Sequence, residues 1–431
     1  MSDILDYYQQ QAQSGVSQIP WLAQLQSKAL TDLKRRGFPT RYDEEWKYTL
    51  VDSLLQQHFV LPDPTVKPAL KTAFDDSPVK NLFLIQNGFI SQEQEWIKNL
   101  PEGVLILPLS LALIHYADLV KPYLGKIVEQ EHGFHYLNTA MLQCLQCGVF
   151  IYIPAGICLE EPIVLKHIQD QTNQAMHLRH LILMEKESQA TLIEEYQGEE
   201  NICYFTNSIT EVFLGAGAKL NHYKIQKESK SAYHLGHLSV RQSAASQFSS
   251  HSLSLGGKLV RSDISVSMQE EQAQCLMNGI YAPGDGQHID HHTVVHHLVP
   301  NCRSDQDYKG ILKGHSRAVF NGKVIVAKNA QHTDAKQQNK NLLLSANAEI
   351  DTKPQLEIFA DDVLCSHGAT VGQLDEEAIF YLATRGISRD EASHYLIQAF
   401  ANDNLRLIPN RDLADWMGNL LTQQLGYANE Y

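Results

Sequence analysis

The chain has 431 residues, of which 43% are hydrophobic, 19% charged and 8% aromatic. This composition belongs to a globular protein with enough apolar residues for two or three domains, and it excludes disordered and collagen-like chains. The 49 acidic residues outnumber the 35 basic ones, which gives a formal net charge of −14, so we expect no sequence-independent binding to nucleic acid.

The first part of the chain is predicted to open with a helix and to contain a small hairpin. Apolar residues recur at helical spacing from Pro20 to Leu33, and Gly37 follows as a stop signal. Further along, the pair Asn87-Gly88 lies between two short apolar runs, which is the residue choice of a two-residue hairpin turn.

A second helical stretch is predicted before the pattern changes. Leucine, isoleucine and tyrosine recur at spacings of three and four over residues 110–145, and from Val149 onward β-branched and aromatic residues replace them. These observations predict an N-terminal helical domain with a small hairpin over residues 1–148.

Strand patterns then follow one another over residues 149–372 without intervening helices. Small or polar corners recur at Ser316, Ala330, Ala348 and Asp362, at steps of 14, 18 and 14 residues. Such a loose period favours a mainly β fold with a parallel β-helix or related solenoid core. A two-sheet β-sandwich is the alternative.

Alternation within these strands predicts which side chains are buried. Ile264, Val266 and Met268 alternate with polar residues, and Leu253 and Leu255 alternate with serines. We expect the apolar residues of both segments to face the inside and the polar ones to face outward.

The last part of the chain, residues 373–431, is predicted to be a C-terminal helical domain. Ser388 and Glu391 have the spacing of a capping box, and Asn410 and Gly426 have the residue types that start and end a helix. Such helices can dock a partner or simply cover an end of the solenoid.

The sequence also indicates the compartment. No apolar run approaches the roughly 20 residues of a membrane span, and the first residues are acidic and polar, unlike a signal peptide. We therefore expect a cytoplasmic protein without membrane contact, whose seven cysteines are reduced. The pair Cys144-x-x-Cys147 ends a helical stretch, where the helix dipole disfavours a thiolate, so we assign it a packing role.

The common catalytic motifs are missing from the sequence. It contains no phosphate-binding loop, no Gly-x-Gly-x-x-Gly, no Gly-x-Ser-x-Gly and no His-Glu-x-x-His. We predict no catalytic residue in this chain.

The densest group of ionisable residues lies at positions 288–297. On a strand, His288, Asp290 and His292 share one face and could ligate one metal ion. The alternative, which we favour, is that hydrogen bonds between stacked strands satisfy these histidines.

A shorter group consists of Cys365 and His367. In an extended segment their side chains share one face, and both residue types suit iron, sulfur-bearing species or zinc. From the residues alone the pair is weak evidence of a site, and a buried cysteine beside a satisfied histidine is the favoured interpretation.

The long segment 348–387, which contains Cys365-Ser-His367-Gly, strongly resembles the signature of the SufB/SufD family of iron–sulfur cluster assembly scaffolds. Segments 290–293, 308–311 and 39–49 fit the same family. The continuation Gly372-Gln-Leu-Asp-Glu-Glu resembles the SufD branch. The resemblance covers residues 37–405.

This resemblance implies a right-handed parallel β-helix core over residues 149–372 with helical domains on both sides. It implies a scaffold without catalysis of its own, paired with a SufB-like paralogue and bound to a SufC-like ABC-type ATPase. The C-terminal helices, with Tyr395, Phe400, Leu413 and Trp416, would dock the ATPase.

It also implies that His367, beside Cys365, is a transient ligand of a nascent iron–sulfur cluster at the interface with the paralogue. The isolated chain would hold no permanent cofactor and could form a homodimer, and flavin use stays open. Two other hypotheses are a stand-alone β-helix metalloprotein using His288, Asp290 and His292, and a secreted β-helix carbohydrate lyase, which the lack of a signal peptide disfavours.

Overall fold

The computed structural model describes residues 2–13, 17–63, 82–90, 100–128, 132–142 and 148–426, and the structural statements below refer to these residues. The helices are α1 (Ser2–Gln13), α2 (Pro20–Arg36), the 3₁₀ helix η1 (Glu44–Trp46), α3 (Asp52–Leu55), α4 (Leu109–His115), α5 (Ala117–Val120), α6 (Gly133–Ala140), α7 (Glu376–Ala383), α8 (Arg389–Leu405) and α9 (Arg411–Leu425).

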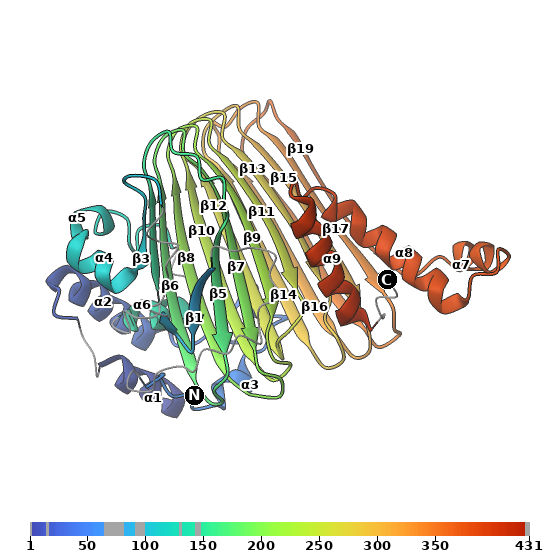
Figure 1. Ribbon diagram of the computed structural model, residues 1–431, viewed down its shortest axis with the longest axis horizontal. Helices are drawn as coiled ribbons and strands as arrows, with labels where there is room; N and C mark the ends of the chain where they lie inside the picture. Colours follow the sequence, from blue (N-terminus) through green and yellow to red (C-terminus); the bar gives the residue numbers. More distant parts are fainter. Residues whose placement is uncertain are drawn as a thin grey trace.

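The strands form two sheets that face each other, as Figure 1 shows. The strands are β1 (Leu82–Gln86), β2 (Phe89–Ile90), β3 (Leu105–Pro108), β4 (Val149–Ile153), β5 (Ile163–Gln169), β6 (Ala175–Met184), β7 (Gln189–Gly198), β8 (Phe205–Leu214), β9 (Lys219–Lys227), β10 (Tyr233–Gln242), β11 (Gln247–Ser254), β12 (Leu259–Met268), β13 (Gln274–Tyr281), β14 (His288–His297), β15 (Arg303–Leu312), β16 (Arg317–Val326), β17 (Asp334–Leu343), β18 (Glu349–Ile358) and β19 (Leu364–Gly372).

Successive strands of this core alternate between the two sheets. In the described part of the chain, the ten-stranded sheet has the order β19-β17-β15-β13-β11-β9-β7-β5-β1-β2, and the nine-stranded sheet has the order β18-β16-β14-β12-β10-β8-β6-β4-β3. From β4 to β19 each strand pairs in parallel with the strand two places along the chain. The result is a parallel β-solenoid of about eight turns flanked by helices, which confirms the predicted fold class.

The corners at Ser316, Ala330, Ala348 and Asp362 each lie between two consecutive strands. The steps of 14 to 18 residues therefore correspond to half a turn, because one full turn needs one strand in each sheet. Among the described strands from β4 to β19, a strand and the next strand of the chain do not pair, whereas strands one turn apart pair in register, such as Gln306 with Gln337.

An apolar core fills much of the space between the sheets. Ile264, Val266 and Met268 are buried in it, as the alternation predicts. The prediction for Leu253 and Leu255 is wrong in its direction. These leucines lie on the outer face, in a cluster with residues of α8 and α9, while the intervening serines are buried on the inner face. Because α8 and α9 cover the outer face of this sheet, apolar side chains are buried there as well, and the leucines face outward against these helices.

The N-terminal segment lies mainly against one end and the outer face of the nine-stranded sheet (Figure 1). The helix after Pro20 and the hairpin at Asn87-Gly88 are confirmed, and both turn residues have positive φ. The helical stretch predicted over 110–145 is broken into α4, α5 and α6. The sequence did not reveal β3, which pairs antiparallel with β4, or that β1 pairs with β5.

The C-terminal helices start and end where the sequence predicts. Ser388 and Glu391 form a capping box, Asn410 caps α9, and Gly426 ends α9 in a left-handed conformation. α8 and α9 pack on the outer face of the ten-stranded sheet, and α7 extends beyond it (Figure 1). None of the described helices combines the length and the apolar character that crossing a membrane requires.

Candidate functional site

Cys365 and His367 lie on β19, at one end of the solenoid. Among the described strands, β19 pairs only with β17, so its other edge has no partner strand. The register places Cys365 beside Ala335 and His367 beside Gln337, and both neighbours are buried on the inner face. Because residues two apart on a strand share a face, Cys365 and His367 both lie on the continuation of the interior.

The two side chains differ in exposure. Cys365 is half-buried and contacts a small apolar cluster at the end of the solenoid, and this burial raises the pKa of its thiol. His367 is exposed. The imidazole is therefore the accessible donor of the pair, and the thiol is kept in its neutral form.

Exposed apolar side chains surround this end of the solenoid. Leu364 at the start of β19 is 75% exposed and Phe359 after β18 is 63% exposed, and Ile358 and Val371 are exposed as well. β18 is also an edge strand in the described part of the chain, with β16 as its only neighbour in the sheet. Two bare strand edges beside exposed apolar side chains are typical of a surface that another chain covers.

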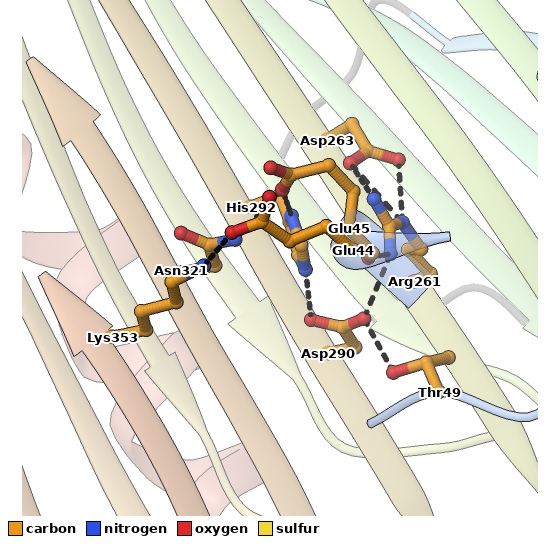
Figure 2. A network of polar contacts seen from close by, with 9 residues as sticks. All are labelled: Glu44, Glu45, Thr49, Arg261, Asp263, Asp290, His292, Asn321 and Lys353. Atoms are coloured by element: carbon orange, nitrogen blue, oxygen red, sulfur yellow. Dashed lines mark hydrogen bonds and ion pairs between the residues drawn. The ribbon is translucent and has the colours of Figure 1, made fainter. Parts of the chain in front are cut away.

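The group at positions 288–292 lies elsewhere, on the outer face of the nine-stranded sheet beneath the N-terminal segment (Figure 2). Thr49 donates to Asp290 Oδ2 at 2.6 Å and contacts His288 Nε2 at 3.0 Å. His292 Nε2 lies 3.0 Å from Asp290 Oδ1, and its Nδ1 lies 3.4 Å from a carboxylate oxygen of Glu45. The polar atoms that could bind a metal are thus engaged by protein groups.

Arg261 completes this network. Its guanidinium contacts Asp290 at 3.2 Å and Asp263 at 3.0 Å, donates to the backbone oxygen of Glu45, and lies over the ring of Trp46. Asn321 donates to Glu45 and Lys353 to Glu44, as Figure 2 shows. Charged residues of three strands and Asn321 of a fourth thus hold η1 and its neighbours on the sheet.

The pKa values agree with this structural role. Burial alone would raise the pKa of Asp290, but His292 and Arg261 outweigh burial and lower it. Burial and Arg261 alone would lower the pKa of His292, whereas Asp290 and Glu45 raise it overall. Both shifts favour the charged form of the group, and a protonated imidazole cannot ligate a metal.

Other histidines are enclosed between the sheets. Val149 N–H donates to His180 Nδ1, so His180 Nε2 carries the proton and donates to His167 Nε2 at 3.2 Å. His167 Nδ1 then donates to the backbone oxygen of Glu195. His291 contacts Ser254 and His297 contacts Ser304. Burial lowers the pKa of His167 to about 3, so the ring stays neutral.

A cavity of about 520 Å³ lies between the N-terminal segment and the nine-stranded sheet, lined in part by His132, His135, His237 and Asp263. The rings of His132 and His135 lie 3.7 Å apart at their centroids. Nowhere in the described ranges do three His, Cys, Asp or Glu side chains converge in a way that could hold a metal ion.

The predicted docking residues of the C-terminal helices have different surroundings. Tyr395 is exposed. Leu413 is buried against the ten-stranded sheet, and Phe400 and Trp416 pack beside it, with Lys309 Nζ 4.8 Å from the Phe400 ring centre. The exposed aromatic residues Phe380 and Tyr381 of α7, which the sequence analysis did not single out, extend the accessible surface. Cys144 and Cys147 lie outside the described residues.

Comparison with known proteins gives matches to two domain models of one protein family, and together they cover nearly the whole chain. Residues 167–400 match the SUF system FeS cluster assembly SufBD core domain, and residues 1–165 match the SufBD protein N-terminal region.

Individual relatives agree with these matches. The chain is 32% identical to an iron–sulfur cluster assembly SufBD family protein of Synechocystis, over 89% of this chain and 86% of that one. It is 32% identical to the iron–sulfur cluster assembly protein SufD of Escherichia coli, over 86% of each chain. It is 25% identical to SufB of Bacillus subtilis, over 72% of this chain and 66% of that one.

Proposed function

Since the chain belongs to the SufBD family of iron–sulfur cluster assembly proteins, we propose that it is the SufD-like subunit of an assembly scaffold. In this proposal it pairs with a SufB-like paralogue and binds a SufC-like ABC-type ATPase, and a nascent cluster forms where the two paralogues meet. The chain itself is no enzyme: it contains no phosphate-binding loop, so the partner supplies ATP hydrolysis.

The observation that carries this proposal is the end of the solenoid at β18 and β19. Within the described residues each of these strands has a paired strand on one side only, and exposed apolar side chains flank their free edges. A second solenoid of similar cross-section, as a paralogue provides, could pair with these edges and cover Phe359 and Leu364. His367 would then lie inside the junction.

The cluster is the cargo of this site. An imidazole nitrogen and a thiolate can both bind cluster iron, and a neutral imidazole is the more labile ligand of the two. His367 is the exposed donor here, whereas Cys365 is half-buried with a raised thiol pKa. We therefore assign the transient ligand role to His367 and a neighbouring role to Cys365.

Docking of the ATPase is assigned to the exposed aromatic residues of α7 and α8, namely Phe380, Tyr381 and Tyr395. Docking also depends indirectly on Phe400, Leu413 and Trp416. These residues do not contact the ATPase in our proposal but hold α8 and α9 on the ten-stranded sheet. Movement of a bound ATPase would reach that sheet, and thereby β19, through these contacts.

The test of the cluster site is His367→Ala in the co-expressed complex. We expect cluster assembly to be lost while the complex stays intact, because one side chain adds little to a large interface. His367→Cys should recover part of the activity, since it restores a ligand, and Cys365→Ser should be milder. Assembly at the normal rate in intact His367→Ala complex would refute the proposed site.

The test of the docking surface uses point variants, because α8 and α9 cover apolar residues of the sheet and their deletion would expose the core. Tyr395→Glu combined with Phe380→Glu should abolish co-purification of the ATPase. Tyr42→Glu, which changes an exposed tyrosine of the N-terminal segment, is the control and should retain co-purification. Retained binding by the double variant would refute the assignment.

A further inference from the structure

A column of polar side chains lies beneath His367 on the inner face of the ten-stranded sheet. His367 pairs in register with Gln337 of β17, and Gln337 pairs in register with Gln306 of β15. Both glutamines are buried, at 1% exposure or less. In parallel strands in register, such side chains stack on one another at the strand spacing of about 4.8 Å.

Contacts below Gln337 fix the orientation of its amide. Gln337 Nε2 donates to Gln306 Oε1 at 3.4 Å, and the same oxygen accepts from the Thr293 hydroxyl at 2.7 Å. Gly322 on the opposite sheet makes room for this amide, because a Cβ at position 322 would lie 2.2 Å from Gln337 Nε2. The amino group of Gln337 therefore points into the solenoid.

The carbonyl end of the same amide is left without a partner. Gln337 Oε1 is buried, and no donor of the described residues reaches it. A buried acceptor without a hydrogen bond costs about 1–3 kcal/mol, so such atoms usually have an assigned donor. His367, the next residue of the column, carries an exposed ring with one N–H donor in its neutral form.

We propose that Gln337 is the positioning residue of His367. In the described structure the exposed ring does not reach the carbonyl of Gln337; a rotation of this ring would place the N–H of one ring nitrogen on that carbonyl and leave the other nitrogen, with its lone pair, for iron. Histidines that bind metals commonly donate their second nitrogen in this way, which fixes the tautomer and the ring orientation. The hydrogen bond involves only residues of this chain, so it can be tested without a cluster. Only its effect on cluster assembly rests on the proposed ligand role of His367.

The experiment measures the tautomer of His367 directly, without a cluster. The full-length chain, labelled with ¹⁵N-histidine, is studied by NMR at pH 8, and the His367 signals are assigned by their loss in His367→Ala. We expect one tautomer in the unsubstituted chain. Gln337→Met, which keeps the length but removes the acceptor, should give a mixture of both tautomers.

Two further variants separate this effect from a general loss of structure. Gln338→Met changes the neighbouring glutamine on the exposed face of the same strand and should leave the single tautomer unchanged. Gln337→Glu keeps an acceptor oxygen at the same place and should preserve the single tautomer as well. A mixture of tautomers in the unsubstituted chain, or one unchanged tautomer in Gln337→Met, would overturn the proposal.

The functional consequence is measured in the complex. Gln337→Met should slow cluster assembly by about 10- to 100-fold, the usual range for an outer partner of a metal-bound histidine, whereas Gln338→Met should not. If His367→Ala assembles clusters normally, the proposed function fails while the NMR result on Gln337 still stands. If His367→Ala abolishes assembly and Gln337→Met leaves both the rate and the tautomer unchanged, the positioning role alone fails.

Discussion

Histidines occur both in the middle turns of the solenoid, defined here as those whose strands have a paired strand on each side, and on its last strand, but their surroundings differ. His167, His180 and His291 of these middle turns lie between the sheets, where hydrogen bonds hold them and burial keeps them neutral. His367 occupies an equivalent inner-face position on β19, but no further turn covers it, and it is exposed. The position along the solenoid axis, and not the residue type, separates the structural histidines from the one to which we assign a ligand role.

The comparison predicts that acid destabilises the middle turns. Burial lowers the pKa of His167, His177 and His291 to about 3 and that of His251 and His297 to about 4, whereas an unfolded histidine titrates near 6.5. Below pH 6.5 the unfolded chain therefore binds protons that the folded chain does not, and stability falls as pH falls. Each such histidine contributes a loss of about 1 kcal/mol between pH 6.5 and 5.5.

Urea unfolding at pH 7.5, 6.5 and 5.5 checks this expectation. His292, in the network around Asp290, acts in the opposite sense. Its pKa is raised in the folded chain, so its protonation stabilises the fold at pH values below the pKa of an unfolded histidine. Equal urea midpoints at pH 6.5 and 5.5 would contradict the assignment of neutral buried histidines.

The next largest effect is expected for Asp290→Ala. The substitution leaves the buried guanidinium of Arg261 and the protonated His292 without their shared carboxylate, which should cost about 3–5 kcal/mol of unfolding free energy. Denaturant unfolding at pH 7.5 measures it. Asp285→Ala removes an exposed carboxylate that also pairs with a histidine, His315, and should leave stability unchanged. Similar stabilities for the two variants would show that the network adds nothing.

A smaller loss is expected for His292→Ala. This variant removes the contacts to Asp290 and Glu45 but leaves Arg261 to neutralise the carboxylate, so we expect a loss of about 1–3 kcal/mol. Metal analysis of the purified chain accompanies the unfolding measurement. Stoichiometric metal that disappears with this substitution would mean that the network is a metal site after all.

The smallest effect on stability is expected at the end of the solenoid. His367→Ala removes an exposed side chain and, with it, the proposed hydrogen bond to Gln337, and should lower the unfolding free energy by no more than about 1 kcal/mol. The same variant should abolish cluster assembly, as described above. A large loss of stability would place His367 among the structural histidines and remove the contrast between the two regions.

Local sequence patterns were enough to predict the ends of the C-terminal helices and the solenoid. The capping box at Ser388 and the hairpin at Asn87-Gly88 depend on contacts within a few residues, and so they could be recognised. The inner and outer faces at Leu253 could not, because α8 and α9, more than a hundred residues later, cover the leucines. Pairing of β1 with β5 likewise joins segments whose relation no local pattern reveals.

The candidate site was predictable to a similar degree. That Cys365 and His367 share a face follows from the period of a strand, and the family resemblance singled them out. The partners of Asp290 could not be foreseen, because Thr49 lies 241 residues earlier in the chain. The role that we propose for Gln337 depends on strand register one full turn away, which the spacing of the corners did not determine.

The unpaired edges of β18 and β19 also have a consequence for the solubility of the chain in the cell. An unpaired strand edge beside exposed apolar residues can template association with other edges, including those of a second copy. If the chain pairs with a paralogue as we propose, a copy made in excess of that paralogue would self-associate or be degraded, and a homodimer joined at these edges would be the mildest form of this. We expect the solubility of the chain to depend on balanced synthesis of the two paralogues, so that translation of one limits the useful amount of the other.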